Sequence, residues 1–145
     1  GNNNMSNSFI EAAVKFKFNL KIGCPKKYSP SDKILKWASK NKSKIFVTKN
    51  PREAAKDADC IMTDKWVSMN DKVNKKAKKK SLKDYQVNKK LFKLAKTECI
   101  FMHCLPVGRG EEVTDEVIDG KQSVVWRQAL NRVHAQKSII KWCLD

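Results

Sequence analysis

Short apolar runs recur along the chain and are separated by stretches in which apolar residues are spaced three or four positions apart. The runs are rich in β-branched residues and end at proline or at polar residues, as buried strands of a parallel sheet do. They are LKIGCP (20–25), KIFVT (44–48), CIMTD (60–64), CIFMHC (99–104) and the short SVVW (123–126). The sequence therefore predicts five strands.

Helical spacing fills most of the segments between the predicted strands. Residues 8–18 place apolar side chains on one helix face behind a cap at Asn7 or Ser8. Ser31 opens a second helix, and a proline in the first helical position opens a short one over residues 51–57. An amphipathic helix covers the C-terminal region.

This alternation predicts the α/β class, because parallel strands need helical crossovers and bury both faces under them. We expect one domain over residues 1–145, built on a doubly wound, Rossmann-like parallel sheet with helices on both faces. Ligands of such folds bind at the carboxyl ends of the strands. The ends of the third and fourth predicted strands are therefore the places to look for a site.

Composition narrows the class of protein. Hydrophobic residues make up 41% of the 145 residues and charged residues 32%, which favours a globular domain. The apolar runs are too short to span a bilayer and no secretory leader is visible, so we expect a cytoplasmic location and no membrane partner. The five cysteines form no C-x-x-C pair, and the sequence predicts neither a metal site nor a cofactor.

Excess positive charge is concentrated in one segment. The net charge is +16, and residues 70–96 hold most of the excess lysine. A solvated helix face is the favoured interpretation. The alternative is a basic interaction module that binds polyanions through the lysines of residues 72–96. Specific nucleic-acid recognition is not expected, because this segment has no arginine and only Tyr85 and Phe92 as aromatic residues.

The fourth predicted strand ends in HCLP. A cysteine in that position is more often buried than functional. Pro106 cannot continue a central strand, however, so the chain must leave the sheet after Leu105. This turns the Cys104 thiol and the Leu105 carbonyl towards the edge where ligands bind. Cys104 is therefore a candidate functional residue.

The third predicted strand ends in TDKWVSM. Asp64 could simply cap a turn. Together with Ser68 and Met69 it also offers an anion, a hydroxyl and a flexible apolar wall, which suits a ligand with an ammonium group on an aliphatic chain. Arg132 lies in the C-terminal helix, where an arginine usually faces solvent.

Several longer motifs occur in a fixed order along the chain. They are GNNNMSNSFIEAA, DCIMTDKWVSMND, DYQVN, FMHCLPVGRGEEVTDEV and VVWRQALNRVHAQK. With these motifs, nearly the whole chain closely resembles the second, ornithine-binding domain of the ornithine carbamoyltransferase family. The related aspartate carbamoyltransferases share the fold but lack the D-x-W-x-S-M loop. The resemblance implies transfer of a carbamoyl group from carbamoyl phosphate to the δ-amine of L-ornithine, which gives citrulline and phosphate.

The resemblance also implies a substrate pocket. Asn4 would hold the α-carboxylate end of ornithine, and Asp64 would bind its α-ammonium group. Ser68 and Met69 would complete the amino-acid pocket. A related transferase that acts on another amine, such as putrescine, is an open alternative.

The catalytic residues implied by the resemblance are Cys104, Asp64 and Arg132. Cys104 would lie beside the attacking amine, the carbonyl of Leu105 would accept a hydrogen bond from the carbamoyl NH2, and Arg132 would bind the carbamoyl oxygen. Such contacts help because the amine must be neutral to attack and charge develops on the oxygen as the tetrahedral centre forms.

The family's carbamoyl-phosphate domain is not represented in this sequence. Neither its S-T-R-T-R phosphate loop nor its H-P-x-Q segment occurs, so the isolated chain is expected to be inactive. The strand that precedes the N-N turn in the family, a central one, is also expected to be missing. Its gap would leave the edges of LKIGC and CIMT unpaired. Either these edges pair with each other or a neighbouring chain pairs with them, and a homo-oligomer is expected.

Overall fold

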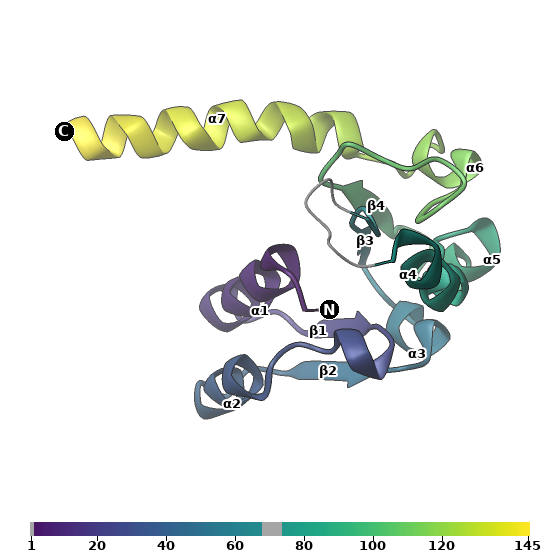
Figure 1. Cartoon of the computed structure of the whole chain (residues 1–145). Helices are drawn as coiled ribbons and strands as arrows, with labels where there is room; N and C mark the ends of the chain where they lie inside the picture. The colour runs from purple at the N-terminus through teal and green to yellow at the C-terminus, as the bar shows by residue number, and fades with distance from the viewer. Residues whose placement is uncertain (1, 68–73) are drawn as a thin grey trace.

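The computed structural model describes residues 2–67 and 74–145, in which helices and strands alternate along the chain (Figure 1). The strands are β1 (Leu20–Gly23), β2 (Ile45–Thr48), β3 (Cys60–Thr63) and β4 (Ile100–His103). The α-helices are α1 (Asn4–Phe16), α2 (Asp32–Lys40), α3 (Pro51–Ala55), α4 (Lys75–Leu82), α5 (Lys89–Phe92), α6 (Asp115–Ile118) and α7 (Val125–Leu144). Two 3-10 helices, η1 (Lys26–Tyr28) and η2 (Lys83–Tyr85), complete the order.

The strands form two parallel pairs. β1 pairs with β2, and β3 pairs with β4. The predicted α/β class with parallel strands is confirmed. Within residues 2–67 and 74–145 no ladder joins the two pairs, so the expected direct pairing between the edges of β1 and β3 is wrong. Each pair has its own packing partners: α3 contacts β1 and β2, whereas α7 contacts β4. Pairing with a neighbouring chain stays a prediction.

The fifth predicted strand, residues 123–126, is also wrong. Only Ser123 bridges to β4, opposite Phe101, and the N–H of Val124 donates to the carbonyl of Phe101 at 2.9 Å. The chain then turns into α7, whose first residue, Val125, is buried in the core. A four-residue apolar run fits a strand and the first turn of a buried helix equally well, so periodicity could not separate the two.

Helix α1 begins earlier than its apolar spacing predicted. Its N-cap is Asn3, not Asn7 or Ser8. The Asn3 side chain accepts a hydrogen bond from the N–H of Ser6 at 2.9 Å, and the Ser6 hydroxyl faces the N–H of Asn3 at 3.3 Å. This reciprocal arrangement is a capping box with serine at the third helical position. The polar first turn extends the helix beyond its apolar stripe and places Asn3 at the edge of the site.

The main core surrounds β4. Phe101 is fully buried and packs edge-to-face on Phe92, with ring centroids 6.4 Å apart. Val113, Val117 and Val125 lie in the same cluster, so the segments on both sides of β4 are held against it. Apolar burial of this kind is worth about 25 cal/mol per Å². The end of β4 is therefore presented by a packed core.

Helix α7 extends away from the body, with only its N-terminal end near β4 (Figure 1). Its large apolar residues after Val125 are exposed, among them Trp126 by 70%, Ile139 by 60% and Trp142 by 80%. Each helix in residues 2–67 and 74–145 is too short or too polar to serve as a membrane span.

Candidate active site

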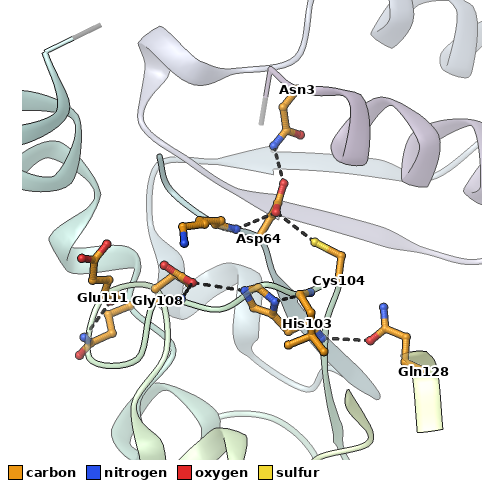
Figure 2. Close-up of polar contacts among 11 residues, drawn as sticks. Asn3, Asp64, His103, Cys104, Gly108, Glu111 and Gln128 are labelled. Carbon is orange, nitrogen blue, oxygen red and sulfur yellow. Dashed lines mark hydrogen bonds and ion pairs between the residues drawn. The ribbon is translucent and has the colours of Figure 1, made fainter. Parts of the chain in front are cut away.

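Three segments that are distant in sequence meet at Asp64. The parallel register of β3 and β4 pairs Thr63 with His103, so the next residues, Asp64 and Cys104, leave the two strands side by side. The Cys104 thiol donates to Asp64 Oδ1 at 3.0 Å, and Asn3 Nδ2 donates to Asp64 Oδ2 at 3.0 Å (Figure 2). The N–H of Lys65 also donates to Oδ1, at 2.7 Å. Asp64 therefore links the start of α1 to the carboxyl ends of β3 and β4.

Cys104 is held as a neutral thiol. Burial, together with the hydrogen bond to the Asp64 carboxylate and its negative charge, raises the pKa of Cys104 to about 12. The thiolate is the nucleophilic form of cysteine, and here it is disfavoured at neutral pH. The geometry makes Cys104 a hydrogen-bond donor to the Asp64 carboxylate.

Beneath this junction lies a buried pair, His103 and Glu112, whose side chains are fully buried. The N–H of Leu105 donates to His103 Nδ1 at 2.9 Å, so the ring proton is on Nε2, which lies 3.4 Å from Glu112 Oε1. The N–H of Gly108 donates to the same oxygen of Glu112 (Figure 2). These contacts fold the segment after β4 back onto the strand end.

Two opposing effects act on the Glu112 carboxyl. Burial raises its pKa, but the neighbouring His103 and the N–H of Gly108 outweigh burial, and the pKa of Glu112 is lower than its ordinary value. The group is therefore a buried carboxylate in the folded chain at neutral pH. Sequence reasoning missed Glu112; the glutamate pair in the RGEEV motif, shortly after HCLP, was the signal that could have pointed to it.

The chain leaves β4 as the position of Pro106 predicted. β4 ends at His103, and Leu105 adopts a left-handed backbone with φ of 52°. An ion-pair cluster holds the far side of the turn, where Arg109 Nη1 lies 2.6 Å from carboxylate oxygens of Asp115 and Asp119. The segment that carries Leu105 is thus tied down on both sides.

Of the residues predicted to complete the amino-acid pocket, the structure describes Asn4 but not Ser68 or Met69. Asn4 is the first residue of α1 and is exposed, beside Asn3, which makes the contact to Asp64. Sequence reasoning missed Asn3 as a site residue, although its place in the N-N pair next to Asn4 was a signal. Ser68 and Met69 lie outside the described residues.

Arg132 is exposed on α7 and makes no hydrogen bond or ion pair to any described residue. One helical turn before it, Gln128 Oε1 accepts a hydrogen bond from the N–H of His103 at 3.0 Å (Figure 2). Residues four apart share a helix face. The hydrogen bond of Gln128 therefore turns one face of α7 towards the end of β4, and Arg132 lies on that face.

Comparison with known proteins identifies the family. Residues 1–143 match the family model described as aspartate/ornithine carbamoyltransferase, Asp/Orn binding domain. The chain is 52% identical to an ornithine carbamoyltransferase of Rhodopseudomonas palustris over 142 residues, which are 98% of this chain and 46% of that protein.

Solved structures agree with this match. The anabolic ornithine carbamoyltransferase of Campylobacter jejuni superposes with a TM-score of 0.91 at 34% identity, over 98% of this chain and 48% of that one. The ornithine carbamoyltransferase of Pyrococcus furiosus gives 0.84 at 43% identity, over 92% and 44%. The chain spans a little under half the length of these relatives. It belongs to the aspartate/ornithine carbamoyltransferase family and matches that family's Asp/Orn-binding domain.

Proposed function

We propose that this chain is the ornithine-binding part of an ornithine carbamoyltransferase, which transfers a carbamoyl group from carbamoyl phosphate to L-ornithine. The observation that carries the proposal is the junction of Asn3, Asp64 and Cys104 at the ends of two parallel strands. The names of the relatives support the choice of ornithine as the amino-acid substrate.

Asp64 is suited to an ammonium group. An ionised carboxylate offers about four acceptor positions. Among residues 2–67 and 74–145, Asn3, Cys104 and the N–H of Lys65 occupy three of them, and only Asn3 bonds to Oδ2. One position on Oδ2 remains for a charged donor from the substrate. A charge-assisted hydrogen bond of this kind is about twice as strong as a neutral one.

The start of α1 is suited to a carboxylate. Asn4 lies in its first turn, which contains no acidic residue, and the first N–H groups of a helix favour an anion. The hydrogen bond from Asn3 to Asp64 holds the start of α1 next to the carboxylate that would bind the ammonium group. An α-amino acid would thus place its two charged groups on Asn4 and Asp64, with Ser68 and Met69 completing the pocket.

In the proposed reaction Cys104 keeps Asp64 oriented while the δ-amine of ornithine attacks in its neutral form. The Leu105 carbonyl accepts from the carbamoyl NH2, and Arg132 stabilises the developing charge on the carbamoyl oxygen. We propose that the residues that bind carbamoyl phosphate lie in a domain outside this chain. A water-free site cannot assemble without them, so the isolated chain binds ornithine weakly and forms no citrulline.

Calorimetric titration tests the binding half of the proposal. L-ornithine should bind more tightly than putrescine, which lacks the α-carboxylate. The change Asp64→Asn should weaken ornithine binding by about 10- to 100-fold, as loss of a charge-assisted hydrogen bond predicts. Asp84→Asn, at an exposed aspartate, is the matched control. Equal affinity for the two amines would refute ornithine as the substrate, and citrulline production by this chain alone would refute its inactivity.

We also propose that the chain works with a further protein surface, either its missing domain or a second copy in a homo-oligomer. The exposed apolar side chains of α7 support this, because an isolated helix face with Trp142 80% exposed is a typical contact surface. Light scattering on the chain at several concentrations would detect self-association. A cytoplasmic location stays a prediction.

A further inference from the structure

Most residues of helix α4 are lysines, so the helix carries many positive charges close together. Five of its eight residues are lysine, Lys83 follows directly, and residues 74–83 contain no acidic residue. Lysines lie three or four positions apart, as in Lys76, Lys80 and Lys83, so their charges meet along the helix surface. Like charges at this spacing destabilise an isolated helix. An anion bound across the lysines would remove that repulsion.

Most of these lysines are available to a partner. Lys75, Lys76, Lys80 and Lys83 are exposed, and none of the four forms an ion pair with a described residue. Lys79 differs, because its Nζ lies 2.5 Å from Glu111. That contact anchors α4 to the segment after β4.

The charged surface extends beyond α4. Lys27, in η1, has its Nζ 4.9 Å from the centre of the Tyr28 ring, and Lys78 Nζ lies 5.9 Å from the same centre. One aromatic ring thus brings together two lysine-bearing segments that are about 50 residues apart in sequence. We call the resulting group the lysine surface: Lys26, Lys27, Lys75, Lys76, Lys78, Lys80 and Lys83.

The composition of the lysine surface selects among anionic partners. A membrane-binding helix needs an apolar face, and α4 offers only Ala77 and Leu82. Bidentate recognition of a base edge favours the planar fork of arginine, and residues 74–83 contain no arginine. Lysine ammonium groups in a row suit a chain of phosphates, whatever its sequence.

We propose that the lysine surface binds the phosphate backbone of nucleic acid without sequence preference. The proposed function is separate from ornithine binding, because the partners of Asp64 among residues 2–67 and 74–145 are Asn3, Lys65 and Cys104 and its site lies at the ends of β3 and β4. Four to five lysine–phosphate contacts give a slope of log affinity against log salt of about −4 on duplex DNA, which is roughly a 250-fold loss of affinity between 50 and 200 mM salt.

The test is fluorescence anisotropy with a labelled DNA duplex at several salt concentrations. The variant K75Q/K76Q/K80Q/K83Q should reduce the steepness of the salt slope by about 3 and weaken binding at least tenfold at 50 mM salt. The matched control K33Q/K36Q/K40Q/K44Q removes the same number of exposed lysines from α2 and the turn after it and should leave the slope unchanged. Replacing the same four lysines, Lys75, Lys76, Lys80 and Lys83, with arginine should restore binding.

Three results would overturn the proposal. Equal losses in the α4 and α2 variants would show that only net charge matters. A preference among duplexes of different sequence would contradict backbone binding. Tighter binding to a heparin oligosaccharide than to DNA of equal charge would assign the surface to sulfated polysaccharide. Far-ultraviolet circular dichroism and ornithine titration of each variant establish that the fold and the other site are intact.

Discussion

Glu112 is the residue whose removal should most directly test how the candidate site is held. Its buried Oε1 accepts a hydrogen bond from the N–H of Gly108 and lies 3.4 Å from His103 Nε2. Glu112→Ala therefore leaves the N–H of Gly108 without its acceptor and removes the carboxylate that faces the imidazole. Leaving a buried donor without its acceptor costs about 1–3 kcal/mol. A domain of this size is stable by about 5–15 kcal/mol. The variant should therefore lose a large fraction of its stability.

Glu112→Gln removes the negative charge of this side chain but keeps its shape. The glutamine oxygen can still accept from the N–H of Gly108, but this hydrogen bond falls from the range of about 1.5–3 kcal/mol for a charged acceptor to about 0.5–1.5 kcal/mol for a neutral one. The change in this contact predicts a loss of about 1 kcal/mol. Urea denaturation at pH 7, followed by circular dichroism, measures both variants. Glu11→Ala, at an exposed position of α1, is the control and should stay within about 0.5 kcal/mol.

The pH dependence gives a second readout of the same group. Because the pKa of Glu112 is lowered on folding, its contribution to stability is present above its ordinary value of 4.5 and is lost as the pH falls through the folded-state value. The free energy of unfolding should thus fall more steeply below about pH 4.5 in the wild type than in Glu112→Gln. A cost below about 1 kcal/mol for Glu112→Ala, together with identical acid profiles, would refute the reasoning.

Two further predictions concern the same site. A Cβ on Gly108 would lie 2.8 Å from Glu112 Oε2, so Gly108→Ala should destabilise the chain by about 1–3 kcal/mol in thermal melts, and an unchanged melting temperature would contradict this packing. Asp64→Asn removes the charge that helps to raise the pKa of Cys104, so alkylation of Cys104 by iodoacetamide at pH 8 should speed up, while alkylation of the exposed Cys143 stays constant as an internal control. Faster alkylation of both cysteines would indicate general loosening of the fold instead.

The sequence by itself determined a helix or strand wherever a single local signal, such as an apolar run, a helix cap or a proline, was strong. The apolar runs at 60–63 and 100–103 form the parallel strands that they predicted, and Ser31 caps α2 as expected. Pro106 ends its strand because proline has no N–H to donate to a ladder. Such signals act within a few residues of the chain, so they can be read without knowing what packs against them. The order of the motifs was likewise enough to indicate the family.

Only the tertiary structure decided which of these elements meet. Asn3 and Asp64 are 61 positions apart, and their hydrogen bond exists because α1 starts beside the end of β3. The burial of Glu112 depends on the chain folding back over His103, and nothing in the RGEEV motif distinguishes a buried glutamate from a solvated one. The separation of the strands into two pairs is decided in the same way. Long-range contacts depend on which surfaces pack together, whereas periodicity reports only which surface of each element is apolar.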